Sequence, residues 1–288
     1  MPQTINTNMN SLNAQRNLSV SQSSLSTAMQ RLSSGLRVNS AKDDAAGLAI
    51  AERMNSQVRG MNAAVRNAND GISLSQTAEG GLGQVSNALQ RMRELAVQAS
   101  NSSNSASDKN SLDKEFGELA NEVQRVLGAT TFNGAHVLGS DAGAMQFQVG
   151  ANTTSNDTNS ISTSDMTSNT SITAVAGTDN AGAGRALIDS TADILAIHTV
   201  IDNIDTALST VNDQRATMGA SQSRFDSVIA NLQNSVENQT AARSRIMDTD
   251  FAAETANLSR AQILQQAGNA MVAQANQLPQ QVLKLLQG

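Results

Sequence analysis

Two histidines, His136 and His198, are the first candidates for chemistry, because imidazole nitrogens bind metals and transfer protons near neutral pH. Motifs such as His-Glu-X-X-His place two ligands on one face of a helix, whereas these two residues stand far apart in the chain. The chain has no cysteine, which excludes thiolate metal sites, thiol catalysis and disulfides. We therefore expect no metal site and interpret both histidines as surface or hairpin residues.

Two other short patterns also have a structural interpretation. Asp43 and Asp44 are adjacent, and neighbouring helical residues point about 100° apart, so the two carboxylates do not converge as an acid pair. At the start of a helix they would stabilise its dipole. The segment GGLGQ (80–84) lacks the lysine and preceding strand of a phosphate-binding loop, so it predicts a weak point or a close-packing site in a helix. The sequence predicts no enzyme and no cofactor.

The composition favours thin helical packing. The 288 residues include five Phe, two Pro, no Trp and no Tyr, which leaves few bulky side chains to fill a wide core. A net charge of −6 and a pI near 4.9, without stacking aromatics, argue against nucleic-acid binding. No apolar run approaches the roughly 18 residues of a membrane span, and the start lacks the features of a signal peptide. We expect neither membrane insertion nor a cleavable signal peptide.

Apolar periodicity predicts three helices in the first half of the chain. The first runs from Ile5 to Leu36 and loosens near residues 33–35. The second begins near Lys42, follows an apolar seam to Ile72, and resumes at Leu82 after a shift in register. A polar break at 101–110 precedes the third, over 112–126, which should fold back on the second.

The middle of the chain changes character. TTFNGAHVLG (130–139) and AMQFQVGAN (144–152) predict two short strands, and Asn133-Gly134 is a turn signal. Residues 151–186 are rich in Ser, Thr, Asn, Gly and Ala and show almost no apolar periodicity. This composition predicts a surface insert that is flexible or only lightly structured.

The second half of the chain carries two more helical seams. From Ile197 to Val236, the spacing between successive seam residues alternates between four and three over about five heptads. This spacing predicts one helix of roughly 40 residues that packs on the second and third helices. A break is expected around residues 243–245 and 248–250. The last helix has a further seam formed by Leu264, Gly268, Met271, Ala275, Leu278, Val282 and Leu285.

The two terminal helices are expected to pair with each other in antiparallel fashion. A pair at the free ends of a chain has too few neighbours to cover all its apolar surface, so other copies must cover the rest. Heterologous contacts that do not close into a ring extend into a helical filament. The predicted fold is mainly α: long antiparallel helices forming a coiled-coil-like rod, with a small β-hairpin region and a short irregular insert.

The expected domains follow this order. A terminal helix segment (1–41) precedes the first part of the helical rod with its hairpin (42–150). The variable surface insert (151–186) follows, then the second part of the rod (187–242) and a terminal helix segment (243–288).

Several long segments resemble bacterial flagellin. They are LSSGLRVNSAKDDAAGLAIAERMNSQVRGMNAAVRNANDGISLSQTAEGGL (32–82), QRMRELAVQ (90–98), TFNGAHVL (131–138), FQVGAN (147–152) and ENQTAARSRIMDTDFAAETANLSRAQILQQAGNAMVAQANQLPQQVLKLL (237–286). The resemblance covers both ends of the chain in the family's order, with a variable middle between them.

The resemblance implies an extracellular structural subunit that polymerises into the flagellar filament and serves swimming motility. It also implies an export chaperone, export through the flagellar type III apparatus, assembly under a cap protein, and contact with hook–filament junction proteins. In the family the terminal segments are disordered in the monomer and pair as helices in the filament core. The residues expected to pack in that core are Leu18, Leu25, Leu32, Leu264, Met271, Leu278, Val282 and Leu285.

Two further roles rest on the same resemblance. QRMRELAVQ is similar to the segment by which many flagellins engage the flagellin-sensing Toll-like receptor of animal hosts, and the matching residues are Arg91, Leu95 and Glu115. Alternatively, Arg91 and Leu95 pack against a neighbouring helix or subunit, with the arginine contributing its aliphatic stem. The hairpin at Asn133 and Gly134 is a candidate switch element by resemblance and an ordinary hairpin by composition.

Two alternatives to a filament subunit stay open. A hook–filament junction protein has similar terminal helices but does not elongate into a long filament. A membrane-active amphipathic protein would need a cationic polar face, and the last helix offers only Arg260 and Lys284. Some relatives in the family carry a metalloprotease insert, and the short insert here has no such motif.

Overall fold

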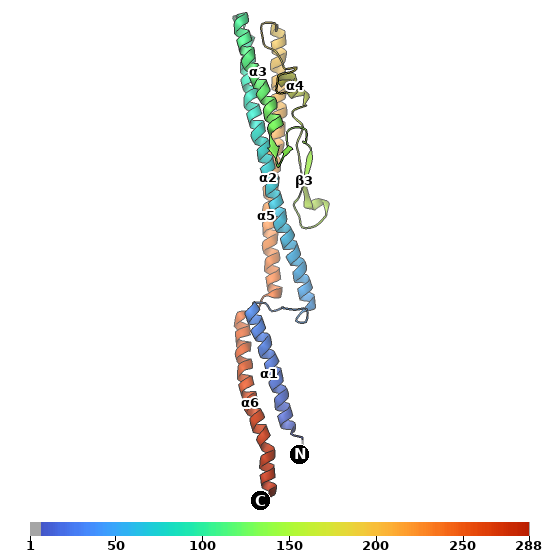
Figure 1. Ribbon diagram of the computed structural model, residues 1–288, viewed down its shortest axis with the longest axis vertical. Coiled ribbons are helices and arrows are strands. Elements are labelled where there is room, and N and C mark those ends of the chain that lie inside the picture. The colour runs from blue at the N-terminus through green and yellow to red at the C-terminus, as the bar shows by residue number, and fades with distance from the viewer. Residues whose placement is uncertain (1–6, 288) are drawn as a thin grey trace. The chain divides into compact units, whose positions relative to one another are not determined.

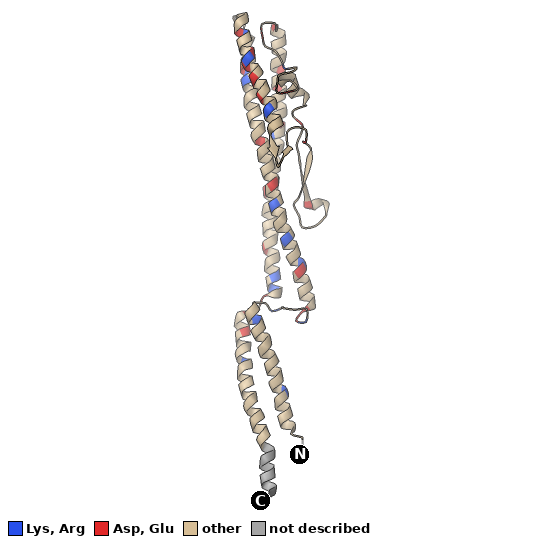
Figure 2. Cartoon of the chain, in the orientation of Figure 1, with Lys and Arg blue, Asp and Glu red and all other residues tan. Residues whose placement is uncertain are grey.

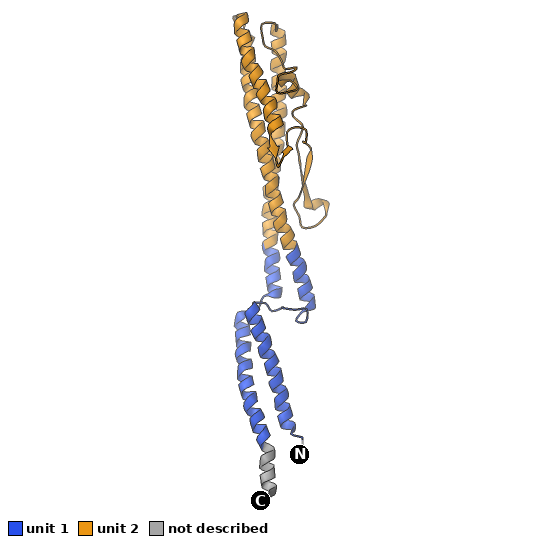
Figure 3. Cartoon of the chain, in the orientation of Figure 1, with its two compact units in different colours: residues 1–56, 237–288 blue, residues 57–236 orange. Residues whose placement is uncertain are grey.

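The structure, a computed structural model, describes residues 7–287, with side chains described as far as residue 277. The chain forms two compact units: unit 1 comprises residues 1–56 and 237–288, and unit 2 comprises residues 57–236 (Figure 3). The elements, labelled in part in Figure 1, are α1 (Met9–Ser34), α2 (Ala45–Ala99), α3 (Ala106–Ala129), β1 (Thr131–Phe132), β2 (Ala135–His136), β3 (Ala144–Gln148), the 3-10 helix η1 (Ser155–Asp157), β4 (Thr158–Ser162), α4 (Thr170–Ala176), α5 (Ile194–Met247) and α6 (Phe251–Gln287).

The mainly α class is confirmed, with long antiparallel helices in unit 2. Over that unit α5 runs without a break beside α2, as its heptads predicted, and α3 folds back on α2 (Figure 1). Two surface ion pairs join these helices: Arg93 to Asp205 of α5 at 2.6 Å, and Arg91 to Glu115 of α3 at 2.8 Å. The hydrogen bond from Arg93 lowers the pKa of Asp205.

The seam of α2 differs from its prediction. The spacing between its buried seam residues alternates between three and four along the helix from Met61 to Ala99. The predicted register shift after Ile72 is therefore wrong. That prediction followed the larger apolar residues, whereas small residues carry the seam in the middle of the helix and let α5 approach closely. The seam consists of Met61, Ala64, Ala68, Gly71, Ser75, Ala78, Leu82, Val85, Leu89, Met92, Ala96 and Ala99.

Gly71 forms a notch in α2 that receives the ring of Phe225 from α5. A Cβ atom on Gly71 would lie 2.8 Å from Cζ of Phe225. The ring is fully buried and also meets Phe147 of β3 edge to face, with centroids 5.6 Å apart. The close approach at Gly71 therefore fixes where α5 sits along α2.

Polar side chains of α5 also meet α2 at one level of the rod. Glu79 of α2 accepts a hydrogen bond from Gln222 at 2.9 Å, and Arg215 lies 3.9 Å from its carboxylate. Arg215 and Gln222 flank Met218, which is fully buried. Polar groups at seam positions lower stability but favour one register over its neighbours, because any other register leaves them unpaired.

The strand pairing also differs from its prediction. Segment 130–139 is not one strand but a hairpin, β1–β2, that turns at Asn133 (φ 50°) and Gly134 (φ 84°). Strand β3 pairs with β4, which lies inside the predicted insert, from Ala144 opposite Ser162 to Gln148 opposite Thr158. The turn signal at Asn133-Gly134 was correct, but its two strands are each only two residues long.

The insert contains more structure than its composition predicted. Residues 151–186 hold η1, β4 and α4, and five of their apolar side chains join the core formed with α2, α3 and α5. Two of these side chains stand singly among polar residues, and the other three lie in α4, whose seven residues are too few to show a helical period. The five side chains are Ile161, Met166, Ile172, Val175 and Ala176.

A buried ion pair fastens the end of this insert to α3. Arg185 donates to both oxygens of Asp113, at 2.9 and 2.6 Å, and the backbone N–H of Ile188 donates to the same carboxylate at 3.0 Å. The hydrogen bond to Asp113 raises the pKa of Arg185, against the opposing effect of burial. Gly117, one turn further on α3, leaves room for the guanidinium.

In unit 1, α1 and α6 pack against each other in antiparallel fashion. The connections that follow α1 and precede α6 are joined by an antiparallel bridge between Leu36 and Asp248. Helix α1 ends at Ser34 and is capped by Gly35 (φ 72°), so it stops within the segment 33–35 where it was expected to loosen and does not continue to the predicted end at Leu36. The backbone N–H of Arg37 donates to the carbonyl of Met247 at 2.7 Å, and that of Thr249 donates to Gly35 at 3.0 Å. Helix α5 continues to Met247, so the break lies only at 248–250 and not at 243–245.

The two adjacent acids lie just before α2 and not in its first turn. Asp44 accepts a hydrogen bond from the backbone N–H of Gly47 at 2.8 Å, which caps the helix. Asp43 accepts from the side chain and backbone of Ser40, and these bonds lower the pKa of Asp43.

Replacing Asp113 with Asn should destabilise unit 2 by about 3 kcal/mol or more, because Arg185 would remain buried without its counterion. The matched control is Glu122→Gln on the same helix, which removes an exposed pair with Arg125 of the same 2.6 Å length and should cost less than about 1 kcal/mol. Urea titrations of the two variants followed by circular dichroism measure both free energies. Equal losses would contradict the anchoring role.

Gly71→Ala should destabilise unit 2 by about 1–3 kcal/mol, because its methyl group would overlap the buried ring of Phe225. Gly83→Ala, on the same helix with open space around the added atom, should instead stabilise the helix by up to about 1 kcal/mol. Thermal unfolding distinguishes the two. Stabilisation by both substitutions would show that the notch does not constrain the ring.

Candidate assembly surface

Helices α1 and α6 bury only a narrow strip of small side chains between them. Ala28 of α1 and Ala261 and Ala275 of α6 are buried in this strip, and Leu18 packs against Gly268, whose added Cβ would lie 3.2 Å from Cδ1 of Leu18. At the end near the N-terminus, Asn8 donates to the carbonyl of Ala275 and Ser11 donates to Asn276, both at 2.7 Å. Small residues bring the helix axes close together but remove little apolar surface from water.

Much of the apolar surface of the pair is therefore exposed. Of the thirteen large apolar side chains that are exposed among the described residues, eight lie on these two helices. Ile263 and Leu264 are consecutive and point about 100° apart, so the exposed surface extends over more than one face. The eight residues are Met9, Leu12, Val20, Met29, Phe251, Ile263, Leu264 and Met271.

The residues predicted to pack in a filament core divide into three groups. Leu18, Leu25 and Leu32 are half-buried on α1. Leu264 and Met271 are exposed beside the intrachain strip, in which Gly268 and Ala275 face α1. The last three, Leu278, Val282 and Leu285, lie outside the residues whose side chains the structure describes.

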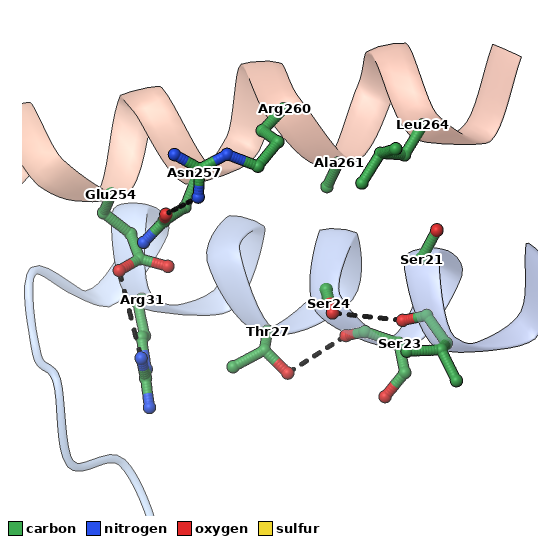
Figure 4. A pocket seen from close by; sticks show the side chains of 11 residues that line it. Ser21, Ser23, Ser24, Thr27, Arg31, Glu254, Asn257, Arg260, Ala261 and Leu264 are labelled. Atoms are coloured by element: carbon green, nitrogen blue, oxygen red, sulfur yellow. Dashed lines mark hydrogen bonds and ion pairs between the residues drawn. The ribbon is translucent and has the colours of Figure 1, made fainter. Parts of the chain in front are cut away.

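A groove runs between α1 and α6 on the side of Leu264 (Figure 4). Its wall on α1 carries hydroxyl groups, of which Ser24 and Thr27 donate to carbonyls of their own helix, four residues earlier, at 3.0 Å. The groove continues past Ser21 and Leu264 towards Asn10 and Ala275. Its length and mixed lining suit another helix better than a small molecule.

Among the residues whose side chains the structure describes, charged groups line only one end of this groove. Arg31 of α1 and Arg260 of α6 are there, with one carboxylate, Glu254 (Figure 4). The Glu254 side chain is 10% exposed and lies 3.9 Å from Arg31, while Arg260 donates to Asn257 at 3.1 Å. Elsewhere on the described part of the pair the only charge is Arg16, so both helices are almost free of charge in Figure 2.

Of the three residues predicted to contact a receptor, two lie on the surface of unit 2 and one is buried in its core. Arg91 and Glu115 are exposed and joined by two hydrogen bonds of 2.9 and 2.8 Å, and Arg91 also donates to Glu94 at 2.9 Å. The bonds to Glu115 and then Glu94 raise the pKa of Arg91. Leu95 is only 1% exposed and belongs to the core, so its expected contact with a receptor is not available in this conformation. Sequence reasoning missed Glu94, although it lies inside the same motif.

The hairpin turn, the two histidines and the GGLGQ segment were the other candidates from the sequence. Asn133 and Gly134 form the exposed tip of the β1–β2 hairpin. Nδ1 of His136 lies 2.6 Å from the carbonyl oxygen of Gly128, and His198 is exposed on α5. Gly81 packs against Thr130, so GGLGQ includes a close-packing site.

The described residues lack two further kinds of site. No group of three or more His, Asp or Glu side chains there is placed to hold a metal ion. Within the same part of the chain, every helix is too short or too polar to cross a bilayer.

Comparisons with known proteins agree with the helical ends of the chain. The bacterial flagellin N-terminal helical region matches residues 5–143, and the C-terminal helical region matches residues 201–286. A flagellin of Halalkalibacterium halodurans is 44% identical over 98% of this chain and 99% of its own length. A flagellin of Xenorhabdus nematophila is 44% identical over 99% of this chain and all of its own. The crystal structure of Bacillus cereus flagellin is similar to 58% of this chain and 88% of its own, with 34% identity and a TM-score of 0.47.

These matches extend over both helical ends and nearly the whole length of the relatives. The chain belongs to the bacterial flagellin family, whose members are the structural subunits of flagellar filaments.

Proposed function

We propose that this flagellin polymerises by placing the exposed faces of α1 and α6 against other copies of the chain. The observation that carries the proposal is the concentration of exposed large apolar side chains on these two helices. Moving a large apolar side chain from full exposure to full burial contributes about 1.5–3 kcal/mol. These eight side chains still expose half or more of their surface, so covering them supplies a substantial driving force for association. Exposure of this apolar surface to water is unfavourable, and association removes it.

The arrangement of the exposed residues favours a filament over a closed pair. Ile263 and Leu264 face different directions, so a single partner on one side leaves one of them uncovered. Contacts on several sides are heterologous, and heterologous contacts that do not close produce a helical assembly. Two helices joined by a narrow strip are marginal alone, and association stabilises them.

The remaining roles follow from the filament proposal. The filament serves swimming motility outside the cell, and the subunit reaches it through the flagellar type III apparatus with the help of an export chaperone. A cap protein and hook–filament junction proteins are its neighbours at the ends. We assign residues 1–41 and 243–288 to the filament core, 42–150 and 187–242 to the surrounding shell, and 151–186 to the variable surface. The hairpin tip at Asn133 and Gly134 is the proposed switch element.

A second role, recognition of the monomer by the flagellin-sensing Toll-like receptor, is supported by the surface around Arg91. Its guanidinium and the carboxylate of Glu115 are both about half exposed and hold each other in one geometry. Leu95 lies beneath this surface and supports it from the core. We therefore propose Arg91 and Glu115 as the contacting residues and Leu95 as a positioning residue.

Leu264→Asp should prevent elongation of filament seeds, because a carboxylate would enter a surface that assembly covers. The control is Leu195→Asp, which places the same charge at a 76% exposed leucine of unit 2 and should elongate like the original chain. Electron microscopy of seeded reactions measures filament length. Both variants should unfold at nearly the parental temperature, because both positions are exposed.

Normal elongation of Leu264→Asp would contradict assembly through α1 and α6. If the parental chain itself stays monomeric on good seeds, the hook–filament junction protein becomes the better interpretation.

Arg91→Ala should abolish receptor signalling by soluble monomer, because no group would remain to pair with an acidic partner or to orient Glu115. The matched control is Arg125→Ala, which removes an equally exposed arginine of the neighbouring helix and should signal normally. A cell reporter assay on purified monomers measures both. Unchanged signalling by Arg91→Ala would count against the contact.

A further inference from the structure

We infer that the charged end of the α1–α6 groove receives a carboxylate from a second copy of the chain, supplied by Glu52 or Glu237, and that this contact sets where the copies sit along one another. The inference rests on the proposed function and adds the chemistry of the partner residue. Apolar faces alone permit sliding between helices, whereas one charge pair favours a single position.

Assembly would cover Arg260 together with its apolar neighbours. The groove is lined along its length by Arg260, Leu264 and Met271. Their spacings of four and seven residues place them on the same side of α6. A partner that covers the exposed Leu264 and Met271 therefore also covers the guanidinium. Removing an arginine from water without a counterion costs several kcal/mol, so the partner must supply an anion.

The chain's own carboxylate does not meet this need. Glu254 is the one acid at this end of the groove, and it is already buried near Arg31 at 3.9 Å. Arg260 forms no ion pair with any described residue, and its guanidinium donates to the neutral amide of Asn257. Two guanidinium groups share one carboxylate, which leaves one positive charge to be balanced from outside.

The proposed assembly places α1 and α6 of neighbouring copies together, so we assign the partner's carboxylate to unit 1 of a second copy. In the described part of unit 1, acids occur only within residues 43–52 and 237–254. Most of these already serve their own chain: Asp43 and Asp44 accept backbone N–H groups, and Asp248 accepts the hydroxyl of Ser244.

Of the other acids, Asp250 caps the start of α6 by accepting from the backbone N–H groups of Ala252 and Ala253. Glu52 and Glu237 are exposed and make no ion pair with a described residue. They are therefore the two carboxylates in these ranges that remain available to a neighbour.

The test compares seeded elongation of Arg260→Gln with that of Arg16→Gln, which removes an exposed arginine of α1 outside the groove. Arg260→Gln should raise the critical monomer concentration at least about tenfold, because the partner's carboxylate would be covered without a counterion. Arg16→Gln should stay within about twofold of the parental chain. Arg260→Lys, which keeps the charge, should recover part of the loss.

The partner is identified by Glu52→Gln and Glu237→Gln. One of them should reproduce the loss, and combining it with Arg260→Gln should add little, because both substitutions remove the same contact. An Arg260→Gln chain that elongates like the parent, equal losses in the Gln and Lys variants, or no effect of either glutamate would overturn the inference. Failure of the parental chain to elongate would instead overturn the proposed function.

Discussion

The smallness of the side chains between α1 and α6 is the constraint on which the rest of the molecule depends. Alanine, glycine and serine let the two helices meet closely, but they bury too little apolar surface to sustain a helical pair in water. The large side chains of the same helices lie outside this strip and remain exposed. Unit 1 is therefore incomplete as a monomer, and covering it by other copies links folding to association.

Unit 2 differs from unit 1 because large side chains of the same chain fill its apolar core. Its small residues also allow close approach, at Ala64, Ala68, Gly71 and Ala78 of α2, but there the partner helix contributes large side chains such as Phe225. The insert adds more, since Ile161 and Ile172 are fully buried in the same core. A unit stabilised in this way stays folded before assembly and can present unit 1 to other copies.

The sequence predicted the positions of the long helices better than it predicted which of their residues pack together. Helix α5 was evident because its large apolar residues repeat over several heptads. The segment 33–35 showed where α1 weakens, but Leu36 was wrongly included in the helix because it continued the apolar period. The register of α2 was missed because Gly71 and Ser75 give no hydrophobic signal, and β4 because Ile161 stands alone among polar residues. The sequence left Leu95 as either a receptor contact or a residue packed on a neighbouring helix, and its burial in the core supports the second interpretation, because burial depends on which face of α2 meets the other helices.

The groove between α1 and α6 was not predicted, since it depends on residues 223 positions apart, Arg31 and Glu254, meeting across the pair. Its polar lining nevertheless has a logic that sequence and structure share. Hydroxyl side chains such as Ser21, Ser24 and Thr27 keep the unassembled surface hydrated, and each also bonds to a carbonyl of its own helix. When another copy covers them, these hydroxyls need no new partner, so their desolvation costs little. A surface built from apolar side chains and self-satisfied hydroxyls can therefore be soluble as a monomer and still be buried on assembly, which lysine and glutamate on the same faces would prevent.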